Sequence, residues 1–216
     1  MNIGGDMRSC SLAVFKSSLV RPIGVIALLA LSSAVSYSAN AQNATVIGEG
    51  SFATDCARVS SVAITTGSAS RQDLLMCDRA ILEGNLGPKD LVASYVNRGV
   101  IHMAMGKPKL ALADINRALA KDSETGEAYV NRGNLWFLGK RLEDAIQDYD
   151  KAIDLGVERP HVAHLNRAMA YEQLGNLDKA KLDYQTALKY RNDWSEAQTR
   201  LDRVEKKLLS ERREDK

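Results

Sequence analysis

The sequence lacks the short motifs that mark several common enzyme classes. It contains no Gly-x-Ser-x-Gly elbow, no glycine-rich phosphate loop and no His-Glu-x-x-His zinc motif. Only three histidines occur in 216 residues, which leaves few candidates for acid–base or nucleophilic chemistry. We therefore expect no catalytic residues and no cofactor, and we predict that the protein is not an enzyme.

A membrane-spanning run is also lacking. The main apolar stretch, Ile23–Leu31, has about half of the roughly 20 apolar residues that a spanning helix needs. Three basic residues precede it and the small-residue pattern Ala39-Asn40-Ala41 follows, which is typical of a secretory signal peptide. We predict that residues 1–41 are cut off after Ala41, so that the protein is periplasmic or secreted. An uncleaved membrane anchor is the alternative.

A surplus of charge disappears once this segment is removed. The segment holds three of the 29 basic residues and one of the 27 acidic residues, so the mature chain would carry 26 of each. A neutral chain offers no electrostatic footprint for nucleic acid, so we expect no nucleic-acid partner and no membrane insertion after cleavage. Residues 42–53 show no helical period and are predicted to be a linker.

One sequence pattern occurs three times in the rest of the chain. The blocks that begin at Tyr95, Tyr129 and His164 each place Asn-Arg before a small residue, at spacings of 34 and 35 residues. A second block follows each in the same phase: Ala111, Asp114, Ala118; Ala145, Asp148, Ala152; Ala180, Asp183, Ala187. A period of this length indicates stacked helix pairs rather than one closed globule.

The repeat sets the predicted boundaries. The parts expected after the linker are a degenerate helix pair over 54–87, three units within 88–194 (92–125, 126–160 and 161–194), and a capping helix with a charged tail over 195–216. Terminal pairs in such arrays are atypical because one face has no neighbour. Accordingly, the first helix of the degenerate pair is expected to be short, from about Asp55 to Ile64.

The repeated residues resemble the tetratricopeptide repeat. The resemblance rests on an aromatic residue (Tyr95, Tyr129), a small residue one turn later (Gly99, Gly133, Ala168) and a glycine after the first helix (Gly106, Gly175). The paired alanines of the second block given above complete the pattern. It implies an all-α, right-handed α-solenoid of helix pairs. It also implies a protein-interaction scaffold whose inner curve holds a protein or peptide partner.

Three asparagines, one in each unit, are the candidate ligand contacts. Asn97, Asn131 and Asn166 occupy the same place on the first helix of their units. In the family that the repeats resemble, this place lies on the inner curve, and an amide there can both donate to and accept from a peptide backbone. Local packing and local hydrogen bonding are the alternative role. The rest of the predicted peptide-binding set is Val96, Val100, Val130, Asn134, Leu165 and Met169.

The chemistry of these helix faces narrows the expected partner. They lack Lys and Arg, which the capture of an acidic chain end would need. An apolar or neutral extended segment, or a helix of a partner protein, is therefore expected. A monomer is predicted. The alternative is a structural module that forms a homodimer through the helix at residues 195–212.

Each unit also repeats an arginine and an aspartate 16 residues apart, one on each helix. The pairs are Arg98 and Asp114, Arg132 and Asp148, and Arg167 and Asp183. Three identical pairs indicate a structural ladder rather than a catalytic device. When such a pair is partly buried, the loss of either partner is penalised because the other charge stays desolvated.

The remaining histidines and cysteines have structural interpretations. His102 and His164 occupy places that are aromatic in other units, so we expect them in the core and predict no metal site. The mature chain keeps Cys56 and Cys77, and an even pair in an exported chain favours a disulfide. Two buried free thiols are the alternative.

Overall fold

The computed structural model of the protein describes residues 51–214, and within this range the chain is a succession of helices without a strand. The helices are α3 (Ser51–Thr66), α4 (Arg71–Glu83), α5 (Pro88–Ala104), α6 (Pro108–Lys121), α7 (Gly126–Leu138), α8 (Leu142–Asp154), α9 (Pro160–Gln173), α10 (Leu177–Tyr190) and α11 (Ser195–Glu214). The predicted signal peptide, its cleavage site and residues 42–50 of the predicted linker lie outside the described residues.

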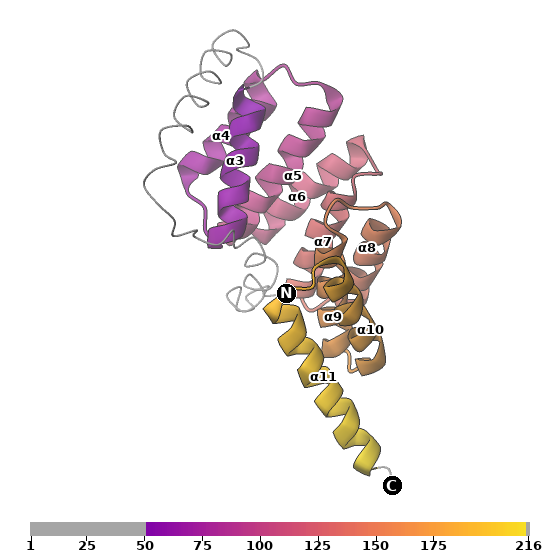
Figure 1. The fold of residues 1–216 in the computed structure, drawn as a ribbon. Helices are drawn as coiled ribbons and strands as arrows, with labels where there is room; N and C mark the ends of the chain where they lie inside the picture. The colour runs from indigo at the N-terminus through magenta and orange to yellow at the C-terminus, as the bar shows by residue number, and fades with distance from the viewer. Residues whose placement is uncertain (1–50, 215–216) are drawn as a thin grey trace, which may run out of the picture.

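The described helices form a stack of antiparallel pairs (Figure 1). In the three units each helix packs most closely on its partner in the pair, whereas α3 packs on α4 and on α5 to the same extent. The second helix of one pair packs on the first helix of the next. The prediction of an all-α solenoid is therefore confirmed. Within residues 51–214, none of the helices combines the length and the apolar character that crossing a bilayer requires.

The first helix of the first pair is longer than the sequence predicted. Helix α3 begins at Ser51 and has 16 residues, so the expected start near Asp55 is wrong and residues 51–53 are helical rather than linker. The reason is that Phe52 continues the apolar period of the helix and packs beside Arg79 of α4, with the guanidinium 4.2 Å from the ring centre. A capping box between Ser70 and Asp73 then starts α4.

The turns inside the three units share one backbone feature. Gly106 and Gly175 have φ of 71° and 79°, in the left-handed region that glycine adopts without strain. In the second unit Gly139 falls one residue early, and Lys140 takes the left-handed conformation with φ of 59°. The turn therefore keeps its shape in all three units although its sequence differs in one.

Small residues allow the two helices of a unit to approach closely. A Cβ atom added to Gly133 would lie 2.6 Å from Cε1 of Tyr149, and one added to Gly99 would lie 2.9 Å from Cγ1 of Ile115. The Tyr149 ring is buried and its hydroxyl donates a hydrogen bond to Asn134 at 2.9 Å, so it cannot swing away freely.

Substitution of Gly133 by Ala is therefore expected to lower the free energy of unfolding by about 1–3 kcal/mol, because overpacking outweighs the better helix propensity of alanine. Urea denaturation followed by circular dichroism measures the change. Gly87→Ala is the matched control, because no atom lies within 4 Å of an added Cβ at that position. Equal stabilities of the two variants would contradict the proposed close contact.

Helix α11 closes the C-terminal end of the stack. Its residues Ala197, Leu201 and Val204 are buried in the same core cluster as α9 and α10, and Trp194 just before it is buried as well. The C-terminal part of α11 extends beyond the other helices in Figure 1. Leu209, near the end of α11, is 57% exposed.

Candidate functional site

The first helices of the units lie along one side of the stack. Helices α5, α7 and α9 contact one another in succession, whereas the second helices α6, α8 and α10 make at most marginal contacts among themselves. Because the helices that approach each other most closely lie on the inner side of a curved stack, α5, α7 and α9 form the inner face. This is the face on which the sequence placed the peptide-binding asparagines.

Two of the three asparagines retain partial solvent exposure. Asn97 on α5 and Asn131 on α7 are both half-buried and occupy equivalent places in consecutive units. The Asn131 side chain donates a hydrogen bond from Nδ2 to the Glu127 carbonyl at 2.9 Å, which leaves its Oδ1 as an acceptor. No hydrogen bond joins the Asn97 amide to another residue of the described range. Val130, next to Asn131 on α7, is also half-buried.

Asn166 is placed differently, contrary to the prediction. It is only 2% exposed, and its Nδ2 donates to Oδ1 of Asn134 at 3.0 Å across the contact between α7 and α9. The same Asn134 oxygen accepts from the Tyr149 hydroxyl. Asn166 therefore helps to join two units and is not accessible to a ligand, and Asn134, 3% exposed, shares this role.

The apolar part of the predicted binding set is also corrected. Val96, Val100, Leu165 and Met169 are buried in the core clusters of the first and third units. The physical reason is that neighbouring first helices pack on each other through this face, so that aliphatic residues at helical spacing fill the contact between units. Of the nine predicted residues, Asn97, Asn131 and Val130 are the ones that keep partial exposure.

The Asn134–Asn166 contact leaves two polar atoms without a partner. Asn134 Nδ2 and Asn166 Oδ1 are buried and make no hydrogen bond within the described residues. A buried unpaired amide atom is unfavourable, so this donor and acceptor mark a polar break in an otherwise apolar contact. The sequence carried a signal for it, because Asn134 stands where the other units have Val100 and Met169.

In each of the three units the arginine donates two hydrogen bonds to the carboxylate of its aspartate. Arg98 Nε and Nη2 donate to the two carboxylate oxygens of Asp114 at 2.7 Å each. The corresponding distances are 2.8 and 2.7 Å for Arg132 with Asp148, and 2.7 Å twice for Arg167 with Asp183. This planar fork geometry is the strongest arrangement available to such a pair.

Each arginine also reaches the preceding pair, which the sequence did not predict. The third nitrogen, Nη1, donates to a residue on the second helix of the preceding pair: Asp78 for Arg98, Asn116 for Arg132 and Asp150 for Arg167. The row of guanidinium groups therefore links successive pairs as well as the two helices of one unit. Such a row stabilises the stack and has no free group to offer a ligand.

A histidine lies beside the aspartate in two of the three arginine–aspartate pairs. His164 Nδ1 lies 2.9 Å from Oδ1 of Asp183, and His102 Nε2 lies 3.6 Å from Oδ2 of Asp114. Burial alone would raise the pKa of Asp183, but hydrogen bonds from Arg167 and His164 outweigh it and hold that pKa below its usual value. Burial lowers the pKa of His102. In residues 51–214, no cluster of three or more His, Cys, Asp or Glu side chains is suited to a metal ion.

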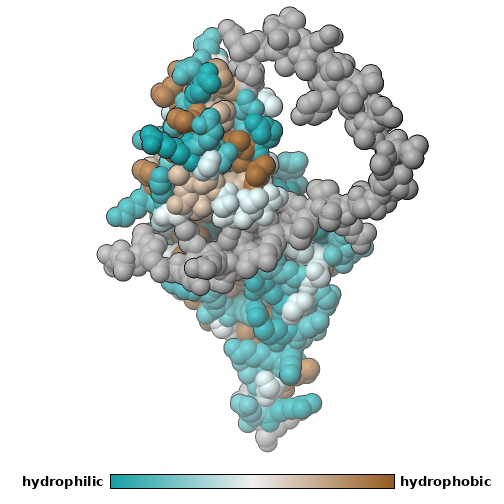
Figure 2. Space-filling model, turned by 90° about the vertical axis from the view of Figure 1, so that its left-hand side faces the viewer, coloured by the Kyte–Doolittle hydropathy of each residue, from teal (hydrophilic) through white to brown (hydrophobic). Residues whose placement is uncertain are grey.

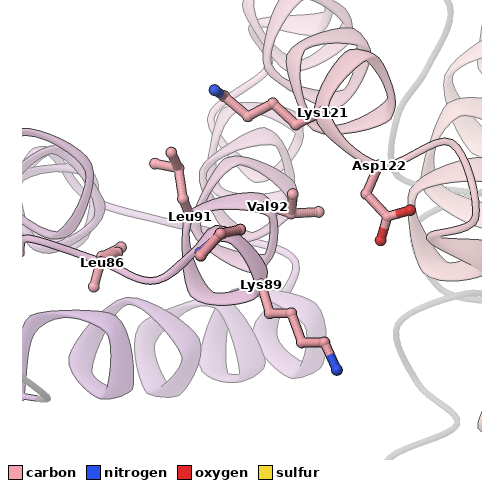
Figure 3. Close-up of a pocket in the computed structure, with 7 residues that line it drawn as sticks. Leu86, Lys89, Leu91, Val92, Lys121 and Asp122 are labelled. Atoms are coloured by element: carbon pink, nitrogen blue, oxygen red, sulfur yellow. The ribbon is translucent and has the colours of Figure 1, made fainter.

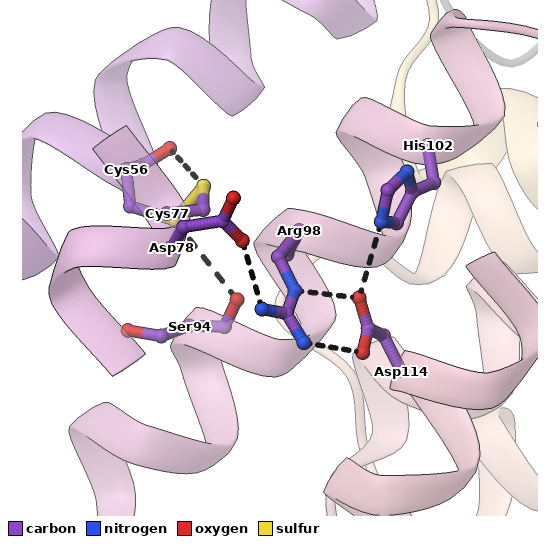
Figure 4. The surroundings of a disulfide bond; sticks show 7 residues. All are labelled: Cys56, Cys77, Asp78, Ser94, Arg98, His102 and Asp114. Atoms are coloured by element: carbon purple, nitrogen blue, oxygen red, sulfur yellow. Dashed lines mark hydrogen bonds and ion pairs between the residues drawn. A yellow bond between two sulfur atoms is a disulfide. The ribbon is translucent and has the colours of Figure 1, made fainter. Parts of the chain in front are cut away.

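The two cysteines join α3 to α4. Their sulfur atoms lie 2.09 Å apart, the length of a disulfide bond, and both side chains are fully buried. Figure 4 shows the bond beside Asp78, which in turn accepts from Arg98 of the next unit. The disulfide therefore lies at the start of the arginine row.

Sequence comparisons identify repeats in most of this region. Models of the tetratricopeptide repeat match residues 96–160 and 161–198. NADPH oxidase activator 1 of Rattus norvegicus is 32% identical over 87 residues, which are 39% of this chain and 18% of that protein. The human mitochondrial import receptor subunit TOM70 is 30% identical over 95 residues, 44% of this chain and 15% of that protein. The chain thus spans less than a fifth of the length of these curated relatives.

Solved structures give the same picture of the fold. The second TPR domain of the human RPAP3 protein, in complex with the HSP70 peptide SGPTIEEVD, is 28% identical with a TM-score of 0.51, over 55% of this chain and 98% of that one. Pseudomonas aeruginosa pilF is 20% identical with a TM-score of 0.64, over 77% of this chain and 72% of that one. At such identity the second likeness concerns the fold alone.

Proposed function

Because this chain belongs to the tetratricopeptide repeat family, we propose that it is a non-catalytic interaction module that binds an extended segment of a partner protein across α5 and α7. The observation that carries the proposal is the pair of equivalent, half-exposed amides of Asn97 and Asn131. The related RPAP3 domain, solved with a bound peptide, supports a peptide as the kind of ligand.

The amides suit a ligand whose backbone is extended. A side-chain amide offers one acceptor oxygen and two donor hydrogens, so it can pair with the N–H and C=O groups of a peptide without reading its sequence. Asn131 keeps its oxygen for this purpose, since its Nδ2 is bonded to the Glu127 carbonyl. The equivalent side-chain amide in the next unit would bind a second peptide group of the same ligand segment.

The surroundings favour a neutral or apolar segment. The guanidinium groups of Arg98 and Arg132 next to the two asparagines are bonded to Asp114 and Asp148, so neither is available for an acidic ligand. Val130, beside Asn131 on α7, adds a half-buried aliphatic side chain. The burial of Asn166 limits the proposed site to the first two units, because α9, the first helix of the third unit, is covered by its neighbours.

Export completes the proposal. It is supported by the signal-like arrangement of residues 1–41 and by the Cys56–Cys77 bond, because structural disulfides persist in oxidising compartments. In such a compartment the module would meet its partner outside the cytoplasm.

The test begins with a photoreactive amino acid at Val130, which crosslinks the partner segment in the native cell envelope so that it can be identified and synthesised. With that peptide, the double variant Asn97→Ala, Asn131→Ala is expected to bind about tenfold or more weakly, since each lost amide contact is worth about 1 kcal/mol. Fluorescence anisotropy measures the dissociation constant.

Asn192→Ala, at an exposed asparagine in the turn before α11, is the matched control and should bind as the parent does. Circular dichroism checks that the double variant keeps its helicity. A folded double variant with unchanged affinity would refute the role of the two amides.

A further inference from the structure

A second candidate site lies at the end of the first unit, away from the two asparagines. An open cavity of about 530 Å³ is lined by the loop after α4, the first turn of α5 and the end of α6 (Figure 3). Its lining residues are Leu86, Pro88, Lys89, Leu91, Val92, Lys121 and Asp122.

The cavity depends on a difference between α5 and the first helices of the other units. By the register of the repeated asparagines, Val92 corresponds to Gly126 at the start of α7. Helix α5, however, begins four residues earlier, at Pro88, and so has an additional turn. This turn, Pro88–Leu91, supplies much of one wall.

The loops that follow the second helices differ as well. In the second unit Val157 is buried over Gly126, close enough that a Cβ on that glycine would lie 2.6 Å from its Cγ1. In the third unit Trp194 is buried with its ring 5.5 Å from that of His161. The first unit has exposed Ser123 in the place of Val157, so no large apolar loop residue fills the space.

The walls combine aliphatic and cationic groups. Leu86, Leu91 and Val92 form the apolar part, and Lys89 and Lys121 extend from opposite sides of it in Figure 3. Both lysines are exposed, and neither forms an ion pair with any residue from 51 to 214.

The one carboxylate in the lining is already bonded. Asp122 accepts from the Glu124 N–H at 2.9 Å and from the Thr125 hydroxyl at 3.1 Å, which directs its oxygens to the turn before α7. The two ammonium groups therefore remain the unmatched charges of the cavity, and they would attract anionic groups.

We propose that this cavity binds a segment of a partner protein in which one bulky aliphatic side chain lies between acidic residues. The aliphatic side chain packs against Leu86, Leu91 and Val92. The acidic residues on either side pair with Lys89 and Lys121. The ligand differs in charge from the neutral segment expected at Asn97 and Asn131, so the two sites bind different sequences.

The probe is the amidated peptide Gly-Glu-Glu-Leu-Glu-Glu-Gly, titrated into the isotope-labelled protein that starts at Gln42. Amide signals of residues 86–92 and 121–123 are expected to shift most. The double variant Lys89→Glu, Lys121→Glu should weaken binding about tenfold or more, because two attractive contacts become repulsive. A peptide with Ser in place of Leu should lose binding to a similar extent.

Lys109→Glu is the control for overall charge, since Lys109 is exposed on α6 outside the cavity lining, and should change the affinity less than about twofold once salt screens distant charges. The proposal is overturned if the double variant binds as tightly as the Lys109 variant. It is also overturned if the shifts concentrate at Asn97 and Asn131. The neutral-segment experiment at those asparagines stands or falls independently of either result.

Discussion

Substitution of Arg167 by Met is expected to lower the free energy of unfolding by about 3–5 kcal/mol, because it strands a buried charge. Asp183 is 4% exposed and receives two hydrogen bonds from Arg167. Methionine keeps most of the aliphatic stem of arginine, so the loss would come from the buried carboxylate, which would keep His164 but lose both bonds from arginine, rather than from a cavity. Urea denaturation followed by circular dichroism at neutral pH measures it.

A double-mutant cycle separates this effect from lost packing. When Asp183→Leu is added to Arg167→Met, part of the stability should return, because no uncompensated charge remains in the interior. We expect a coupling energy of about 2 kcal/mol or more between the two substitutions. Additivity of the two single changes would mean that the pair contributes little, despite its geometry.

An exposed pair provides the control. Arg58 and Asp55 on α3 are joined at 3.0 Å, but their side chains are 64% and 39% exposed. Arg58→Met is expected to change stability by less than about 1 kcal/mol, since solvent screens such pairs. A similar loss in both variants would argue against burial as the cause.

The arginine row shows what the sequence could predict. A pair that recurs at one spacing in three units must occupy one place in the fold, so its existence followed from the repeat alone. Its third bond did not follow, because the accepting residue is an aspartate in two cases, Asp78 and Asp150, and the uncharged Asn116 in the other. The contact between pairs depends on how successive helices are set beside each other, which periodicity does not specify.

The asparagines show the limit of the same reasoning. Repetition placed Asn97, Asn131 and Asn166 on one face of their helices, but equivalent positions differ in exposure when the neighbouring residues differ. Asn134 accepts a hydrogen bond from Asn166 and another from Tyr149, and α11 with its preceding Trp194 adds cover at the end of the stack. A face that is open in the middle of an array can therefore be closed near its end.

The cavity of the first unit was not predicted for a related reason. It arises where the unit departs from the repeat, through an additional turn before Val92 and through Ser123 in the place of Val157. A search for agreement among copies passes over such departures. The exposed apolar residues of the first pair, Val62, Leu75 and Leu82, were also unpredicted, and in the view of Figure 2 the apolar side chains of the visible face are scattered among hydrophilic ones.

Removal of the disulfide is the second change with a large expected effect. The bond closes a loop between residues 21 apart, and in the chain-entropy description such a bond contributes about 3 kcal/mol by restricting the unfolded chain. The variant Cys56→Ala, Cys77→Ala should therefore unfold at a lower urea concentration than the parent. A thiol reductant added during urea denaturation should lower the stability of the parent and leave the stability of the variant unchanged. This comparison controls for the two side-chain substitutions.

The loss should begin in the first pair and extend to the next unit. Helix α4 carries both Cys77 and Asp78, and Asp78 accepts from Arg98 at 2.9 Å (Figure 4). When α3 and α4 separate more easily, this contact opens with them, so hydrogen exchange should accelerate most in α3 and α4, then in α5, and least in α9 and α10. Free thiols on both cysteines in the unreduced parent, with a stability that reductant does not change, would instead support two buried thiols. The stability of the first pair would then rest on its apolar contacts and its capping box alone.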